Sequence, residues 1–456
     1  MSERSSETAI RVGFDYFIRG VEQTSVMAAA ITGQGTGTHA YNQIAAASAN
    51  AMLGFLASTA FLDTQVVHLD VRDRSAAKEL AKKYPDLFGV RKGNAGASTE
   101  RLDVLPGVKA QVEGRLHLCI SPTDGKTAAA DGLEGGSISA IAASEENGLA
   151  DPYEGQFDHL YVVCARREIV ENSDFADALA LGVKKRWTPG EGVFDWTSSL
   201  KIKNLYKQVV QKVGALPTVA LLSADDHTAW RDAGFRVRRL NGSSVAAGLL
   251  TALKSSETHV FAGCVRRSHA VMLSVAMRAT GGALWAAPLV RPPTKARNEL
   301  RKKKYLLAEN PGAVTTAKDF APGENSFLLV AGISDQPAVR GVRFKKDQRV
   351  SVQTIAFAKA GEMRRTTSRE FDLVDHKFHC FDGKQNGAAA WISAASAIKQ
   401  FRNTFLKSDG EEGDLDRQAG EPKTKTLEQS EQPEPSLSGA EEVVVKATPQ
   451  DTVKKK

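Results

Sequence analysis

The sequence predicts a layered α/β fold. Helical and strand patterns alternate between the two ends of the chain, which is typical of sheets covered by helices. Short β-branched runs, such as 217–223 and 326–333, have the length and composition of buried strands. At 456 residues, the chain is longer than one ordinary core fills. The length therefore predicts either two packed subdomains or one large layered domain with a tail.

The elements follow in order from the N-terminus. Helical spacing of Ala, Met and Leu predicts helices over 21–32 and 44–60, and β-branched runs predict strands at 65–69 and 114–120. A regular unit follows, with strands at 160–163, 217–223, 234–240 and 258–263 and helices at 199–213, 226–233, 244–254 and 268–279. The predicted strands 326–333 and 349–358 close the folded part.

Composition divides the chain into five segments. Residues 408–456 are mostly Glu, Lys, Pro, Gln, Ser and Gly, which cannot bury enough apolar surface to offset chain entropy, so we expect a disordered acidic tail. The segments before it are a flexible N-terminus (1–11), a first subdomain (12–150), a second α/β subdomain (151–290), and a basic segment with C-terminal strands and a helix that complete the fold (291–407).

The net charge of +7 is unevenly distributed. Residues 408–456 hold twelve acidic and seven basic residues, a balance of −5, which leaves +12 on residues 1–407. Residues 291–304 alone contain seven basic residues and one acid. An excess of this size favours a polyanionic partner such as nucleic acid.

Two classes of protein are disfavoured by composition. No run approaches the roughly 18 apolar residues of a membrane span, so we expect no membrane partner. The four cysteines lie far apart without a C-x-x-C pair, which argues against a disulfide framework or a cysteine zinc site and favours an intracellular protein.

Four turns rich in Gly, Ser or Thr are candidate ligand sites: 33–37, 121–127, 241–244 and 263–269. Ligands of open α/β sheets gather where strands end, and exposed N–H groups at such turns can hold an anion. Charged side chains and further donors accompany them at Lys126, Arg266, Arg267 and His269. The alternative is that Gly and Ser simply form the turns.

These turns carry a resemblance to class II, GlpX-type fructose-1,6-bisphosphatases. Residues 14–60 resemble the opening of that family, residues 121–126 (SPTDGK) align with its DPIEGT, 241–248 (NGSSVAAG) with its PDGDVAAS, and 263–270 (GCVRRSHA) with its GIGGAPEG. The resemblance runs in order from Val12 to Leu373. It implies the layered αβαβα sandwich of the sugar-phosphatase (fructose-bisphosphatase/inositol-monophosphatase) superfold, with phosphate bound between two subdomains.

The departures from the family pattern concern its metal ligands. Those positions fall on Ala45, Asp70, Ser121, Asp124 and His269, so two carboxylates of five remain. Hard divalent cations need several carboxylates to activate water, and losing three should abolish their productive binding. We therefore expect a pseudoenzyme without catalytic residues or a resident cofactor. Mg²⁺ is expected only as an ion carried with phosphate, with Asp70 and Asp124 as weak candidate ligands.

The chain is also similar to the paired guide-RNA-associated proteins of the kinetoplastid mitochondrial RNA-editing machinery. That similarity implies a non-catalytic subunit that stabilises guide RNA and holds its 5′-triphosphate in the former bisphosphate pocket. It further implies a heterodimer or heterotetramer with a paralogous subunit, inside a larger mitochondrial complex. Residues 1–20 mix Arg with acids and show no clean presequence, so a cytoplasmic location stays an alternative.

The expected phosphate and RNA contacts are Lys126, Thr127, Ser243, Ser244, Arg266, Arg267, Ser268, His269, Lys302, Lys303, Arg364 and Arg365. Basic side chains outside the turns would follow the RNA backbone, because phosphate contacts supply most sequence-independent affinity. The alternative for those side chains is an ordinary solvated surface. Two other functions stay open: an active phosphatase with a metal site rebuilt around Asp70, Asp124 and His269, and a structural subunit with an empty pocket.

Overall fold

The computed structural model describes most of the chain up to residue 406. The described residues are 3–32, 38–59, 62–69, 102–103, 112–131, 136–150, 159–170, 216–222, 228–290, 306–307, 315–358, 363–381 and 389–406, with scattered residues between 203 and 214. Met1–Glu411 form one compact unit. The predicted tail, 408–456, lies outside the described residues. None of the helices in the described ranges combines the length and apolarity needed to cross a bilayer.

The first sheet combines strands from the beginning and the end of the folded chain. Its strands are β1 (Leu62–Leu69), β2 (Leu102–Asp103), β3 (Val112–Asp124), β4 (Ile138–Glu145), β12 (Ser326–Gly332), β13 (Arg343–Phe344), β14 (Arg349–Ala358) and β15 (Met363–Asp372). Their order is β13-β14-β12-β4-β3-β1-β2, with β15 paired to β14. Strand β1 runs parallel to β3, whereas β4, β12 and β14 pair antiparallel with their neighbours.

The second sheet is built mainly from the middle of the chain. Its strands are β5 (His159–Ala165), β6 (Thr218–Leu222), β7 (Arg236–Leu240), β8 (Val260–Arg266), β9 (Ala283–Val290), β10 (Leu306–Leu307) and β11 (Thr315–Thr316). Their order is β10-β9-β5-β8-β6-β7, with β11 paired to β9. Two further strands, β16 (Lys377–Phe381) and β17 (Ala389–Ser393), pair only with each other among the described residues.

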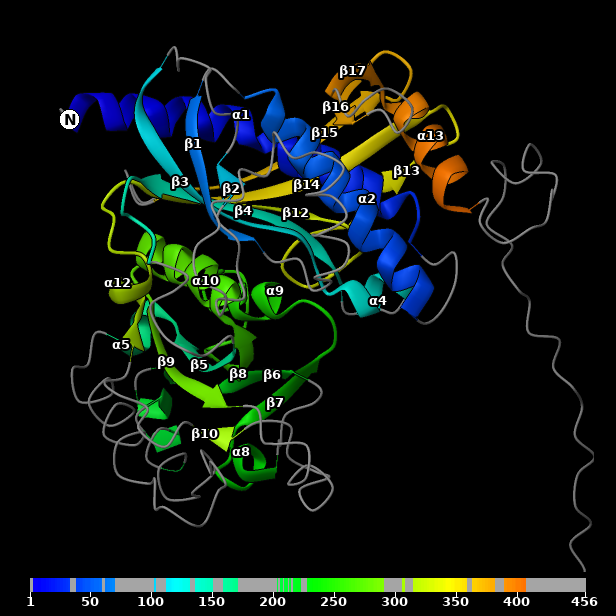
Figure 1. The fold of residues 1–456 in the computed structure, drawn as a ribbon. Helices are drawn as coiled ribbons and strands as arrows, with labels where there is room; N and C mark the ends of the chain where they lie inside the picture. The colour runs from blue at the N-terminus through cyan, green and yellow to red at the C-terminus, as the bar shows by residue number, and fades with distance from the viewer. Residues whose placement is uncertain are drawn as a thin grey trace, which may run out of the picture. The chain divides into compact units, whose positions relative to one another are not determined.

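Helices lie on both sides of each sheet (Figure 1). Their bounds are α1 (Glu3–Ala29), α2 (Thr38–Ala57), α4 (Lys126–Ala130), α5 (Arg167–Val170), α8 (Thr228–Asp232), α9 (Ser244–Leu249), α10 (Arg267–Thr280), α12 (Ala317–Phe320) and α13 (Ala394–Leu406). Helices α1 and α2 cover one face of the first sheet, and α9 and α10 lie between the two sheets (Figure 1). Helices α5 and α8 contribute to the layer beyond the second sheet.

The alternation of side chains along the strands explains these layers. On β12, Leu329 packs with α1 and α2, whereas the next residue, Val330, packs on the α10 side. On β5, Val162 faces the α10 layer and Val163 faces the outer layer with Trp230. Both sheets are therefore buried on two faces. The predicted α/β fold, a layered αβαβα sandwich of the sugar-phosphatase type, is confirmed.

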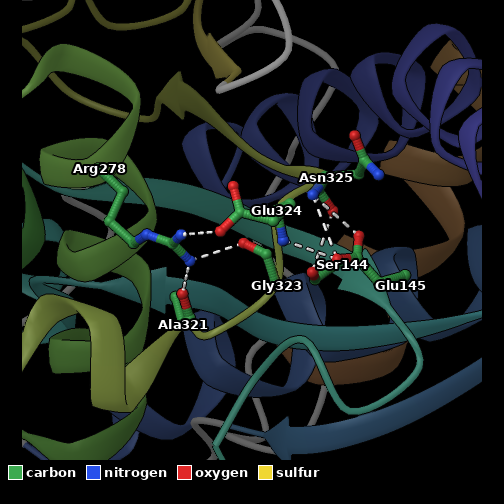
Figure 2. Close-up of polar contacts among 7 residues, drawn as sticks. All are labelled: Ser144, Glu145, Arg278, Ala321, Gly323, Glu324 and Asn325. Carbon is green, nitrogen blue, oxygen red and sulfur yellow. Dashed lines mark hydrogen bonds and ion pairs between the residues drawn. The ribbon is translucent and has the colours of Figure 1, made fainter.

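Helix α10 is the central element and is anchored at its C-terminal end by Arg278 (Figure 2). The Arg278 guanidinium donates to the carbonyl oxygens of Ala321 and Gly323 and pairs with Glu324 at 3.0 Å. Glu145, at the end of β4, accepts the Glu324 backbone N–H at 2.7 Å. These bonds fix the loop that enters β12 against both α10 and β4. The other end of α10 is left to form the site described below.

The N-terminus differs from its prediction. Residues 1–11 were expected to be flexible, but α1 already begins at Glu3. Ala9 is fully buried and Ile10 is 8% exposed, because both side chains belong to the core between the helix and the first sheet. This burial could not be predicted locally, since the mixture of Arg and acidic residues in this segment hides its apolar face.

Candidate functional site

Three of the Gly- and Ser-rich turns meet where strands from both sheets end. Asp124 ends β3 of the first sheet, Ser243 follows β7 of the second, and His269 lies in the first turn of α10, directly after β8. Hydrogen bonds connect the three turns, and we call the set Asp124, Gly125, Lys126, Ser243, Ser244 and His269 the Asp124 junction. Except for Gly125, each of these residues is less than a tenth exposed. The fourth turn, 33–37, lies outside the described residues.

Asp124 joins the two sheets by capping α9. Its Oδ2 accepts a hydrogen bond from the Ser243 hydroxyl at 2.6 Å and another from the Val245 backbone N–H at 2.9 Å. The Ser243 Oγ in turn accepts the Ala246 N–H at 2.9 Å, so Ser243 is the N-cap residue of α9. The helix N-terminus that the sequence offered as an anion cradle is therefore already bonded to a carboxylate of the protein itself.

His269 connects the third turn to the other two. Its Nδ1 lies 2.7 Å from the Ser244 Oγ and 3.8 Å from the Asp124 Oδ1. The same ring nitrogen thus faces both a hydroxyl and a carboxylate. This arrangement is not a nucleophile–base–acid relay, which would use both nitrogens of the imidazole. It is a buried polar contact that holds the start of α10 against α9.

Close backbone contact requires a glycine at the centre of the junction. Gly125 has a φ of 85°, in the left-handed region, and a Cβ there would lie 2.6 Å from the Gly136 oxygen and 2.8 Å from the Ser243 nitrogen. That oxygen and nitrogen are themselves hydrogen-bonded at 3.0 Å. The glycine of 121–126 therefore serves the approach of two backbones, in addition to forming a turn.

Sequence reasoning missed one wall of the site. Ser137, at the start of β4, donates its N–H to the Ser334 hydroxyl at 3.0 Å and accepts the Ile333 N–H at 2.9 Å. Gln336 covers Gly136 so closely that a Cβ on that glycine would lie 2.4 Å from the Gln336 side chain. The loop after β12 thus backs the junction. This loop lies within the span Val12 to Leu373 that carries the family resemblance, which was the available signal for this wall.

The cationic side chains expected at the site do not share one environment. Lys126 begins α4 and is 7% exposed, and Thr127 beside it is exposed. Arg266 is the half-buried N-cap residue of α10. The Arg267 guanidinium lies 5.8 Å from the ring centroid of Phe320, so it is engaged with α12 as a cation–π contact.

Two of the serine hydroxyls expected to bind phosphate are used inside the protein. Ser243 bonds Asp124, and Ser244 contacts His269. Ser268 is 9% exposed, and its backbone oxygen accepts a hydrogen bond from the Cys119 thiol at 3.3 Å. A phosphate oxygen could accept from the Ser243 hydroxyl only by displacing its bond to Asp124, whereas the donor in the Ser244–His269 contact depends on the tautomer of the ring.

The basic residues near the C-terminus of the fold are not part of the junction. Arg365 of β15 lies opposite Ala356 of β14. The row of residues paired across neighbouring strands continues from Ala356 through β12 and β4 to Ile120 of β3. Four strand spacings of about 4.8 Å place the Arg365 backbone roughly 19 Å from β3. Arg364, one residue before it, is equally remote. Local sequence could not show this separation, because it depends on strand order. Lys302, Lys303 and Asp70 lie outside the described residues.

The described residues do not fit a divalent metal ion. A hard cation needs several oxygen ligands, and within the described ranges no three His, Cys, Asp or Glu side chains converge to hold one. Asp124 Oδ2, the oxygen nearest α9, already accepts two hydrogen bonds. We therefore derive no chemical step through a metal at this site.

Comparison with known proteins points to one family. Residues 195–370, less than half of the chain, match the model of the bacterial fructose-1,6-bisphosphatases that are glpX-encoded. The D-fructose 1,6-bisphosphatase class 2/sedoheptulose 1,7-bisphosphatase of Trichodesmium erythraeum is 27% identical over 122 residues, which cover 25% of this chain and 35% of the relative. The enzyme of that name from Gloeobacter violaceus is 22% identical over 246 residues, covering 50% and 63%. The chain thus spans about a third to two thirds of the length of these relatives.

These names correct one prediction made from the sequence. The chain was expected not to be an enzyme, because three of five metal-ligand positions carry other residues. The relatives are named as bisphosphatases, and this finding points to an enzyme. A count of metal ligands by alignment does not decide activity, because a site is assembled in space and its groups need not keep their alignment positions. At low identity, the chain resembles the class II, GlpX-type fructose-1,6-bisphosphatase family.

Proposed function

We propose that the protein binds the phosphoryl group of a phosphate ester at the Asp124 junction. The observation that carries this proposal is the Asp124 cap, because it locks the end of β3 to the start of α9 and so fixes the turns of both sheets relative to each other. The locked junction contains the buried cation Lys126, and the half-buried Arg266 and the exposed hydroxyl of Thr127 lie next to its residues in the chain. Fixed cationic donors of this kind recognise phosphate oxygens.

The first candidate ligand is a guide RNA, held by its 5′-triphosphate. The +12 charge on residues 1–407 supports this ligand, since RNA affinity comes mostly from cations placed along the phosphate backbone. In this proposal the protein works with a paralogous subunit in a mitochondrial RNA-editing complex. Mg²⁺ arrives with the triphosphate and is not a resident cofactor.

The second candidate is a sugar bisphosphate that the protein hydrolyses. The names of the relatives support it, since they act on fructose 1,6-bisphosphate and sedoheptulose 1,7-bisphosphate. Hydrolysis needs more than the Asp124 carboxylate, which is bonded to α9, so further groups must come from residues beyond the described ranges. Asp70, the other carboxylate retained from the family pattern, is the leading one.

A pair of measurements tests the proposal. The affinity of one short RNA is compared with a 5′-triphosphate and with a 5′-hydroxyl, and phosphate release from fructose 1,6-bisphosphate is followed with Mg²⁺ or Mn²⁺. Lys126→Ala combined with Arg266→Ala is expected to remove the preference for the triphosphate or the phosphate release, whichever the wild type shows. Arg267→Ala, which removes the cation over Phe320, is the matched control. A wild-type protein that shows no preference for the 5′-triphosphate and releases no phosphate would refute the proposal.

A further inference from the structure

An arginine-rich strand lies at the edge of the second sheet. Strand β7 has the sequence RVRRL, and no strand of the described residues pairs with its outer side (Figure 1). Arg236, Arg238 and Arg239 are all exposed. Within the described ranges, its one partner is β6, with which it pairs in parallel. Its outer edge therefore presents backbone groups together with a row of guanidinium groups.

This edge leads directly into the Asp124 junction. Strand β7 ends at Leu240, and Ser243 begins three residues later. Arg239 is four residues before Ser243, a chain distance of at most about 14 Å. Arg238 lies opposite Ala220, which packs in the layer that contains α9. Because side chains alternate along a strand, Arg236 and Arg238 share the face of the sheet on which α9 lies.

Among the described residues, Arg236 and Arg238 are not held in strong ion pairs. Arg236 pairs with Glu257 at 3.3 Å, but both side chains are at least 70% exposed, and such surface pairs are weak and easily exchanged. Among the described residues, no carboxylate forms an ion pair with Arg238. The nearest other acid in sequence is Asp232, at the end of α8. Arginines on an edge strand also prevent sheet-to-sheet aggregation, which is the alternative explanation.

We propose that Arg236 and Arg238, which share one face of β7, bind the phosphodiester backbone of a single-stranded RNA whose 5′ end lies at the Asp124 junction. This inference rests on the RNA candidate of the proposed function. A linear row of guanidinium groups follows one strand of phosphates, and guanidinium binds phosphate oxygens in pairs. The junction holds the terminal phosphates, and the β7 edge extends the contact to the nucleotides that follow.

The test compares a ligand that reaches only the junction with one that also reaches β7. The probes are ATP and a 5′-triphosphorylated single-stranded RNA of about 12 nucleotides, a length in the range that one binding module covers. Arg236→Ala with Arg238→Ala is expected to reduce the salt slope of RNA binding by about 1.4, since each phosphate contact on a single strand contributes about 0.7. By the same relation, RNA binding at 0.1 M salt weakens about 25-fold. ATP binding is expected to stay unchanged.

Two control variants make the result specific. Arg115→Ala with Arg343→Ala removes the same charge from exposed positions of the first sheet and is expected to leave the slope within about 0.5 of wild type. Arg236→Lys with Arg238→Lys keeps the charge and is expected to retain most of the slope. A β7 variant with the wild-type slope, in a protein that still prefers the 5′-triphosphate, would overturn the β7 inference alone. Equal binding of 5′-triphosphate and 5′-hydroxyl RNA overturns end recognition, whereas no RNA binding at physiological salt overturns both.

Discussion

Replacing Asp124 by Ala tests the central contact of the site. The substitution leaves the Ser243 hydroxyl and the Val245 N–H without their acceptor in a region that is less than a tenth exposed. Hydrogen bonds to a charged group contribute about 1.5–3 kcal/mol each, so the two together predict a loss of about 4 kcal/mol in the free energy of unfolding. In Asp124→Asn, the amide oxygen can take the place of Oδ2 and accept both bonds without the charge, so a smaller loss of about 2 kcal/mol is expected.

Urea unfolding at neutral pH measures both variants. Asp131→Ala, at the exposed C-terminal cap of α4, is the matched control and is expected to change stability by less than about 0.5 kcal/mol. An Asp124→Ala protein as stable as this control would refute the capping role. The same titration with Mg²⁺ adds a second check, since a ligand that binds only the folded state stabilises it. A Mg²⁺-dependent stabilisation that disappears in Asp124→Ala would assign the carboxylate to a cation instead of α9.

Three further predictions concern the backbone, a buried acid and the thiols. Gly125→Ala is expected to lower the free energy of unfolding by about 3 kcal/mol, because it combines left-handed backbone strain with a Cβ placed 2.6 Å from a backbone oxygen. The control is Gly214→Ala, which is also at positive φ but has open space around it. In the same urea titration it should cost only about 1 kcal/mol. Burial raises the pKa of Glu22, so ionisation of this side chain opposes folding. Glu22→Gln should therefore gain stability relative to wild type as the pH rises from below 4.5 through the raised pKa. A difference in unfolding free energy between the two proteins that is constant from about pH 4 to 8 would contradict this. Burial raises the pKa of the Cys380 thiol to about 12, so iodoacetamide should label the half-buried Cys264 well before Cys380 in the native protein. Mass spectrometry measures the two labelling rates, and equal rates would contradict this prediction.

Much of the fold could be predicted from local sequence. The runs 217–223, 326–333 and 349–358 form strands β6, β12 and β14 with ends shifted by at most one residue, because β-branched segments between turn residues leave few alternatives. The predicted helix 268–279 is α10, lengthened by one residue at each end. The helix predicted at 244–254 is shorter, since α9 ends at Leu249.

The candidate site was predictable in part. Ligands of α/β sheets gather where strands end, and this rule selected the turns near residues 124, 243 and 269. The structure brings these three turns into contact. The bonding of each group could not be predicted. Asp124 looked like a metal ligand in the sequence, whereas in the structure it caps α9.

The sequence by itself determined which segments are strands and helices, where glycine and serine turns fall, and how charge divides between residues 1–407 and the tail. Only the tertiary structure decided the order of strands, which separates Arg365 from the junction, and the stacking of Arg267 on Phe320. The physical reason is that propensity and periodicity act over a few neighbouring residues. The partner of a carboxylate or a guanidinium is chosen by groups that are distant along the chain and adjacent only after folding.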